Sequence, residues 1–264
     1  MKIYLIGDIG GYTNITKKLF NNISKDSSNN DIIILLGDNF YPNGITDISD
    51  NKWKNFNDLN INISTYSILG NHDYLGNIES QINYKLNNWN MENNYYKKVI
   101  DKFDLFFIDT CILVPDYSNL NYKIVKSKLK KEPLKESKLM LDWLSEELKK
   151  SSNIKLVIGH YPMVSFGMYG INKLLFHKLF PIFKENDVKY YISGHDHNLQ
   201  IIDVTSENYS FKQIISGSGC CTYPILKNIS KSIFSKNGYL YINTEDNSLN
   251  IIDSNNSNIY KEDI

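Results

Sequence analysis

The chain has 264 residues, enough for a large hydrophobic core, and its 29 basic residues are balanced by 29 acidic ones. This neutral balance argues against nucleic acid or an anionic membrane as the main partner, because both require concentrated basic charge. The sequence contains neither arginine nor alanine. A phosphate-binding site would therefore have to use metal ions, His, Asn, Lys and backbone N–H groups in place of bidentate guanidinium groups.

Short apolar segments recur along the chain up to residue 192 and predict buried strands. In chain order they are Ile3–Ile6, Ile32–Leu36, Ser67–Leu69, Leu105–Ile108, Leu156–Ile158 and Val188–Ile192. Polar stretches with helical periodicity lie between the later segments. They predict one helix over Leu134–Lys150 and a second over Asn172–Glu185 that is broken at Pro181.

The chain beyond Ile201 has a different pattern, in which short strands alternate with turns. Strands are predicted at Phe211–Ile215, Tyr239–Ile242 and Leu249–Ile252. We therefore expect an α/β layered fold with a strand-rich C-terminal half. No internal repeat or linker is visible, so residues 1–264 are expected to form a single domain.

Cysteine usage and targeting signals bear on the compartment. Cys111, Cys220 and Cys221 make no disulfide framework, since the last two are adjacent and would bridge only with strain. The N-terminal apolar stretch is too short for a signal peptide, and no segment approaches membrane-spanning length. These features predict a cytoplasmic or other intracellular protein with no membrane partner. If a leader has been removed, the protein would instead be secreted or lysosomal.

Polar residues that can bind metal follow five of the predicted strands. They are Asp8, Asp38, Asn71 with His72, His160, and the pair His195 and His197. Each residue alone would be read as a turn former or a loop residue. However, a glycine precedes every one of the five motifs, and four of the five histidines in the chain fall in this set. Because sites form beyond the carboxyl ends of strands in α/β sheets, we interpret the set as a metal site.

The motifs resemble those of one known family. They are Gly37-Asp38-Asn39-Phe40-Tyr41, Gly70-Asn71-His72-Asp73, Gly159-His160-Tyr161-Pro162 and Gly194-His195-Asp196-His197. Together with Gly7-Asp8 they resemble the calcineurin-like metallophosphoesterase superfamily, and within it the small, tartrate-resistant type of purple acid phosphatase. The resemblance runs from about Lys2 to about Gly219. It implies a four-layer α/β/β/α sandwich of two mixed sheets flanked by helices.

The resemblance also implies two metal ions. Most superfamily members carry a His two residues after the first Asp, where this chain has Gly10, and Tyr41 restores the ligand count. A phenolate is a hard anionic donor that favours Fe(III). The ferric ion would be held by Asp8, Asp38, Tyr41 and His197. The second ion, which would be Fe(II), zinc or manganese, would be held by Asp38, Asn71, His160 and His195.

The implied reaction is hydrolysis of a phosphomonoester by a metal-bound hydroxide with an acidic pH optimum, as in acid phosphatases. The substrate would be a phosphorylated small molecule or a phosphoprotein, contacted by Asn71, His72 and Tyr169. His72 would contact the phosphoryl group or protonate the leaving group, and the alternative is that it orients a ligand. Tyr169 stands where relatives have a second His, and a tyrosine is a poorer proton donor at acid pH. The Lys-rich segment 115–131 corresponds to a region that covers the site in relatives.

Two other functions remain open. A phosphodiesterase or nuclease of the same superfamily is less favoured, because those branches usually keep the His that Gly10 replaces and because no basic track for a strand is evident. We therefore expect no nucleic-acid binding. A catalytically inactive binding protein that keeps the fold is opposed by the complete ligand set, since Asp or His residues left without metal would be buried charge or unsatisfied polarity.

Overall fold

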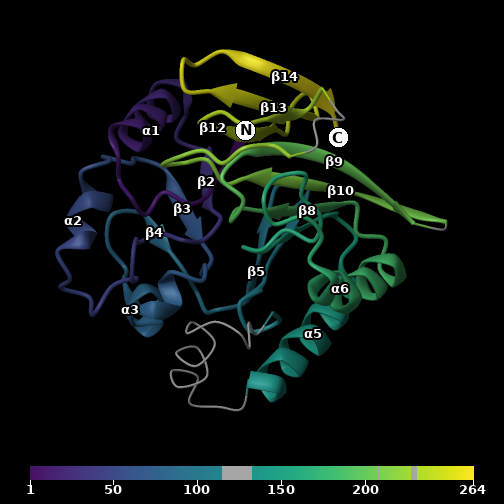
Figure 1. Cartoon of the computed structure of the whole chain (residues 1–264). Coiled ribbons are helices and arrows are strands. Elements are labelled where there is room, and N and C mark those ends of the chain that lie inside the picture. Colours follow the sequence, from purple (N-terminus) through teal and green to yellow (C-terminus); the bar gives the residue numbers. More distant parts are fainter. Residues whose placement is uncertain (115–132, 207, 227–230) are drawn as a thin grey trace.

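Two seven-stranded sheets lie face to face at the centre of the computed structural model, which describes residues 1–114, 133–206, 208–226 and 231–264 (Figure 1). The first sheet has the order β14-β13-β12-β1-β2-β3-β4. Its strands are β1 (Lys2–Ile6), β2 (Ile32–Leu35), β3 (Ser64–Ser67), β4 (Trp89–Asn90), β12 (Gly238–Asn243), β13 (Ser248–Asp253) and β14 (Asn258–Asp263). Strands β1 to β4 are parallel, and β12 pairs antiparallel with β1, so the sheet is mixed.

The second sheet has the order β11-β9-β10-β8-β7-β6-β5. Its strands are β5 (Tyr96–Ile100), β6 (Phe103–Phe107), β7 (Ile154–Ile158), β8 (Tyr190–Ser193), β9 (Leu199–Ser206), β10 (Tyr209–Ser216) and β11 (Ile233–Phe234). Strands β6, β7, β8 and β10 are parallel, whereas β5 and β9 pair antiparallel with their neighbours. Both sheets therefore place several carboxyl ends at one edge.

Helices cover the outer faces of both sheets (Figure 1). The helices α1 (Asn14–Asp26), α2 (Lys52–Asn57) and α3 (Ile78–Asn83) lie beside the first sheet, and α5 (Pro133–Lys150) and α6 (Lys173–Glu185) lie beside the second. The predicted α/β/β/α sandwich of two mixed sheets is therefore confirmed. None of the described helices combines the length and the apolar character that a membrane span requires.

The two sheets meet through aromatic and apolar side chains. Tyr66 of β3 lies 6.1 Å from Phe107 of β6, measured between ring centroids. The Tyr96 hydroxyl of β5 donates a 2.8 Å hydrogen bond to the carbonyl of Ser67 in β3. Because these contacts join the sheets beside the ends of β3 and β6, they fix the position of one sheet's loops relative to the other's.

Some elements differ from the sequence-based predictions. Helix α6 continues through Pro181, since Leu175, Leu179 and Phe183 bury one face on both sides of the proline and compensate for the lost backbone hydrogen bond. Strand β3 ends at Ser67, where the predicted strand began. The buried residues after it belong to the turn that leads into Gly70.

Candidate metal centre

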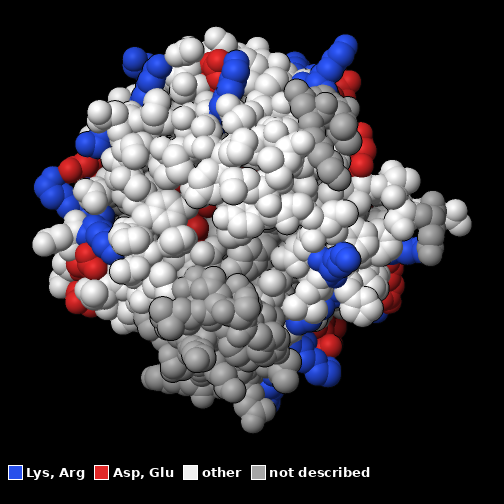
Figure 2. Space-filling view, in the orientation of Figure 1, with Lys and Arg blue, Asp and Glu red and all other residues white. Residues whose placement is uncertain are grey.

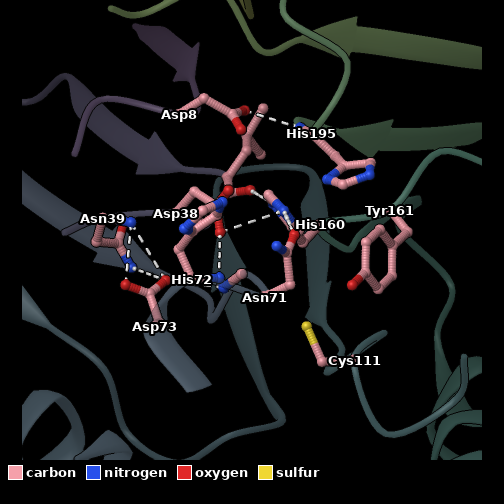
Figure 3. Close-up of polar contacts among 12 residues, drawn as sticks. Asp8, Asp38, Asn39, Asn71, His72, Asp73, Cys111, His160, Tyr161 and His195 are labelled. Carbon is pink, nitrogen blue, oxygen red and sulfur yellow. Dashed lines mark hydrogen bonds and ion pairs between the residues drawn. The ribbon is translucent and has the colours of Figure 1, made fainter. Parts of the chain in front are cut away.

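The predicted ligands come together where the carboxyl ends of strands from both sheets meet, and Figure 3 labels five of them, Asp8, Asp38, Asn71, His160 and His195. Four of them belong to loops of the first sheet: Asp8 after β1, Asp38 and Tyr41 after β2, and Asn71 after β3. Three belong to loops of the second sheet: His160 after β7, and His195 and His197 after β8. The site therefore lies on the seam between the sheets, and each sheet supplies part of it.

One cluster is centred on the phenol oxygen of Tyr41. This atom lies 3.1 Å from Asp8 Oδ1, 3.1 Å from Asp38 Oδ2 and 3.1 Å from His197 Nε2. His197 Nε2 is also 3.3 Å from Asp8 Oδ1. Four side chains thus direct oxygen or nitrogen atoms at one point, as the predicted first metal site requires.

A second cluster is centred on His160. Its Nε2 atom lies 3.1 Å from Asn71 Oδ1 and 3.5 Å from Asp38 Oδ1. The ligand atoms of Asp38, His160 and His195 all lie within 4.8 Å of one another. Asp38 therefore faces the first cluster through Oδ2 and the second through Oδ1, which is the arrangement of a carboxylate that bridges two cations.

An unpaired buried atom indicates that a group belongs in this site. His195 Nδ1 is buried and has no hydrogen-bond partner among the described residues. Its main-chain N–H donates to Asp8 Oδ2 at 2.8 Å, so the backbone is held while the ring nitrogen is not. Leaving such an atom unsatisfied costs about 1–3 kcal/mol. A cation bound by the imidazole would satisfy it.

Three of the candidate ligands have a backbone conformation that residues other than glycine rarely adopt. Asp8, Asp38 and His195 have φ angles of 59°, 53° and 65°, each in the left-handed region. Such residues cost about 1–3 kcal/mol each and cluster at functional sites. Close approach explains one of the glycines that precede the ligands, because a Cβ on Gly70 would lie 2.2 Å from Asp38 Oδ1.

The electrostatics of the site favour a bound cation. Asp8 and Asp38 are 0% and 2% exposed, and no lysine of the described chain lines the cavity beside them. Burial raises the pKa of Asp38, and burial together with both carboxylates raises the pKa of Tyr41. Burial lowers the pKa of His195, which keeps the imidazole in the neutral form that binds metals. A cation would reverse the penalty on the anionic groups.

Hydrogen bonds fix the orientation of the histidine rings. His160 Nδ1 lies 2.8 Å from the carbonyl oxygen of Leu36, which directs Nε2 toward Asn71. His72 Nδ1 lies 2.6 Å from the carbonyl oxygen of Pro42, and the His72 main-chain N–H donates to Asp38 Oδ1 at 2.9 Å. His72 is thereby attached to the Asp38 carboxylate, and its side chain lines the cavity.

Asp73 holds together two of the loops that carry candidate ligands, a role that the sequence analysis did not assign. Its carboxylate accepts hydrogen bonds from the Gly70 main chain at 2.8 Å, from Gln81 Nε2 at 3.0 Å and from the Asn39 main chain at 3.1 Å. Burial raises the pKa of Asp73 to about 6. The residue therefore joins the loop that carries Asp38 to the loop that carries Asn71.

A cavity of about 320 Å³ opens beside the two clusters. It is lined by Asp38, Tyr41, Pro42, Asn71, His72, Tyr169, His195, His197, Cys220, Cys221 and Tyr223. The ring of Tyr169 lies 4.0 Å from that of His195, and the ring of Tyr223 stacks on His197 at 4.3 Å and 6°. All three predicted substrate contacts, Asn71, His72 and Tyr169, therefore line the same cavity as five of the predicted metal ligands, Asp38, Tyr41, Asn71, His195 and His197.

Four cavity residues were not assigned to the site by sequence reasoning: Pro42, Cys220, Cys221 and Tyr223. The last three follow β10 and lie more than 20 positions after His197, so no local sequence motif identifies them as part of the site. The Lys-rich segment 115–131 that was expected near the site lies outside the described residues.

The charge on the visible face is uneven (Figure 2). Lysine side chains lie scattered near its margin, and the middle is largely uncharged apart from a small area of Asp or Glu. No continuous basic stripe crosses the part of this face that the described residues form.

The fold and the two clusters that share Asp38 are those of a metallophosphoesterase domain. Residues 1–199 match the calcineurin-like phosphoesterase family, and the chain belongs to that family. Among curated proteins it is similar to tartrate-resistant acid phosphatase type 5 of Mus musculus, with 32% identity over 229 residues. The alignment covers 80% of this chain and 66% of the mouse protein, so the chain spans just under two thirds of that relative.

Solved structures show the same fold. GAP50, described as the anchor in the inner membrane complex of Plasmodium, matches with a TM-score of 0.77 and 21% identity over 100% of this chain and 88% of that one. The purple acid phosphatase PPD1 from yellow lupin seeds matches with a TM-score of 0.70 and 14% identity over 98% of this chain and 52% of that one.

Proposed function

We propose that the protein is a binuclear-metal phosphatase that hydrolyses phosphomonoesters, of the acid phosphatase type. The observation that carries the proposal is the position of Asp38, whose two carboxylate oxygens face two separate ligand clusters. Two cations held in this way can clamp both ends of an in-line phosphoryl displacement. The similarity to acid phosphatases supports the choice of a monoester substrate.

In this proposal the first ion, Fe(III), is held by Asp8, Asp38, Tyr41 and His197, and the second, Fe(II), zinc or manganese, by Asp38, Asn71, His160 and His195. When bound, the metals supply Lewis acidity and an activated water. Neutral donors dominate the second group, so it favours a divalent ion that retains room for a substrate oxygen. The buried, unpaired Nδ1 of His195 supports this assignment.

The side chains around the cavity position the substrate. Asn71 contacts both the second cluster and the cavity, so its amide is placed to hold a phosphoryl oxygen beside the metals. His72 is anchored through Nδ1 to Pro42, which leaves Nε2 to donate a proton to the leaving alkoxide. Tyr169 covers His195 with its ring and presents a hydroxyl as a hydrogen-bond donor to phosphate.

The alternatives make different demands on the molecule. A phosphodiesterase or nuclease needs a charged path for the second substituent of its substrate. The scattered lysines on the face in Figure 2 do not favour this function. A non-catalytic protein with the same fold, as the likeness to an anchor protein allows, would have no use for a buried set of anionic and imidazole ligands.

The test is hydrolysis by the metal-loaded chain of a phosphomonoester and of the matching diester. We expect the monoester to be preferred and His195→Ala to lose activity by about 10²-fold or more, because one metal would lose a ligand. His177→Ala is the matched control, since His177 is exposed on α6 outside the site. Preference for the diester would favour the second function. If the metal-loaded chain cleaves neither the monoester nor the diester, only the non-catalytic function would remain.

A further inference from the structure

Two adjacent thiols line the metal cavity, and the proposed function gives them no role. Cys220 Sγ and Cys221 Sγ lie 3.6 Å apart. Cys221 is exposed, and its Sγ atom lies 2.7 Å from His197 Nδ1. The three ligand-type atoms of His197, Cys220 and Cys221 all lie within 4.8 Å of one another.

The sulfur of Cys221 occupies the place of an orienting group. Metal-binding histidines almost always donate their second ring N–H to a carboxylate, a carbonyl or water, and this contact fixes the direction of the ligating nitrogen. His160 follows that rule, since its Nδ1 contacts the carbonyl oxygen of Leu36. His197 instead contacts a thiol. Its orienting partner is thus a group whose chemistry an oxidant can change.

The loop that carries the thiols is anchored on both sides, so the sulfurs stay beside His197. The Thr16 hydroxyl donates to the carbonyl of Gly219 at 2.9 Å, and the Thr13 hydroxyl donates to the carbonyl of Cys220 at 3.3 Å. On the other side, the Tyr223 main-chain N–H donates to the carbonyl of His197 at 2.7 Å. The contact between Cys221 and His197 is therefore built into the fold.

We propose that Cys220 and Cys221 form a peroxide-reactive dithiol, and that their oxidation to a disulfide withdraws the sulfur from His197 and weakens the first metal site. The oxidation itself depends only on the thiols. The effect on metal binding rests on the proposed metal centre. Because the thiols line the substrate cavity, a small hydroperoxide that enters it meets them directly.

The chemistry balances with a hydroperoxide as the two-electron oxidant. The Cys221 sulfur attacks one peroxide oxygen, the O–O bond breaks, and the products are a sulfenic acid and one water or alcohol. The Cys220 sulfur then attacks the sulfenic sulfur, the S–S bond forms, and a second water leaves. Two thiols are oxidised and one hydroperoxide is reduced.

Because Cys220 and Cys221 are adjacent in the sequence, a disulfide between them would be easily reduced. Consecutive Cα atoms are about 3.8 Å apart, closer than the roughly 4.4–6.8 Å found in ordinary disulfides. A bond formed across so short a span is strained and more easily reduced, which is typical of labile, regulatory disulfides rather than structural ones. Cys111 is the internal reference, because it is buried and does not line the cavity.

The first experiment measures intact mass and thiol alkylation before and after treatment of the full, metal-loaded chain with hydrogen peroxide. We expect a loss of about 2 Da, protection of Cys220 and Cys221 from alkylation, and reversal by dithiothreitol. The Cys220→Ser/Cys221→Ser double variant should show none of these changes, and Cys111→Ser should show all of them. A gain of about 16 or 32 Da without a disulfide, or a disulfide that involves Cys111, would overturn the proposed pair.

The second experiment measures how strongly the oxidised and reduced chains retain metal against a chromophoric chelator. We expect one of two ions to be held about 10–100-fold more weakly after oxidation, and reduced Cys221→Ala to show the same weakening. Equal retention by the oxidised and reduced chains would overturn the link to His197. If the reduced wild type binds no metal at all, the proposed metal centre is wrong, and so is the proposed effect of oxidation on it. The mass measurement still decides whether Cys220 and Cys221 form a disulfide.

Discussion

The phenol oxygen of Tyr41 lies 3.1 Å from Nε2 of His197, although 156 positions separate the two residues in the sequence. Tyr41 follows a strand of the first sheet and His197 a strand of the second. Their meeting depends on the way the sheets pack, and it brings a phenol and an imidazole to the same point as Asp8.

Replacing Tyr41 by Phe removes the phenol oxygen from the first cluster and changes little else in the cavity wall. We expect iron-loaded wild type to have a visible absorption band from tyrosinate bound to Fe(III), and Tyr41→Phe to lack it and to retain less iron. Tyr223→Phe is the control, because it keeps both the ring that stacks on His197 and the main-chain hydrogen bond to His197. A band that persists in Tyr41→Phe would rule out the assigned phenolate ligand.

The role of His72 can be separated from ligand orientation by changing the leaving group. General acid catalysis contributes about 10²–10⁴-fold when the departing oxygen needs a proton. His72→Asn should therefore lower kcat by about that factor for an alkyl phosphate and far less for 4-nitrophenyl phosphate, whose leaving group departs as an anion. A similar loss for both substrates, with reduced metal content, would show instead that His72 orients a ligand.

Tyr169 offers a gain-of-function test. Burial raises the pKa of Tyr169 to about 12, so the phenol stays protonated but is a far weaker acid than an imidazolium. Tyr169→His should raise activity toward alkyl phosphates below pH 6, where a histidine is charged, and leave it nearly unchanged above pH 7.5. The pH profile of kcat measures this difference. Tyr169→Phe, which lacks the hydroxyl, should raise KM at every pH.

Metal removal should lower the free energy of unfolding. At a metal concentration about 100 times Kd, binding adds about 2.7 kcal/mol, which corresponds to roughly 5–10 °C in Tm for a chain of this size. Asp38→Asn should lose most of this increase, since Asp38 faces both clusters. The apo form of the variant should be at least as stable as apo wild type, because burial already opposes ionisation of this carboxyl. Thermal unfolding with and without chelator provides the measurement.

The expected pH dependence of stability depends on buried carboxyl groups. Burial raises the folded-state pKa of Asp109 to about 6, above the value of about 3.9 in unfolded chains. The folded state therefore binds more protons at Asp109 between these values, so the contribution of Asp109 to stability is greatest below pH 4 and is lost as pH rises through about 6. The full effect is on the order of 2–3 kcal/mol.

Asp109→Asn keeps the shape of the side chain and removes this titration. Urea unfolding of the chelator-treated chain at pH 4 and pH 7 should show a smaller difference for the variant than for wild type, with a remainder because the pKa of Asp73 is also raised. Asp142→Asn, an exposed change on α5, should leave the difference as it is. An unchanged difference in Asp109→Asn would contradict the assigned titration.

The positions of the candidate ligands after strands were predictable because each combines a local apolar run with a glycine and a polar residue. Asp8, Asp38 and His160 all follow such runs, and their convergence comes from the parallel strands that carry them. Helix α1 was not predicted, since only Leu19, Phe20 and Ile23 form its apolar face and its N-terminus depends on a Thr13–Thr16 capping box.

Contacts that depend on packing could not be predicted. The sulfur of Cys221 reaches His197 across 24 positions, and no periodicity links the two. The hydrogen bonds of Asp73 likewise depend on Gln81 and on the main chain of Asn39, which only the folded loops bring together. Local sequence patterns therefore indicate which residues can bind metal, whereas the residues that orient them depend on the tertiary structure.

The division of the candidate ligands between the two sheets limits when, during synthesis of the chain, the proposed ions can bind. Residues up to Asn71 supply four of the candidate ligands, and the remaining three lie between His160 and His197. A nascent chain that has emerged only through the first group can hold neither proposed ion with its full set of donors. The centre is completed only after the strand before His195 has been added to the second sheet. Binding of both proposed ions with their full sets of donors therefore requires the chain through His197.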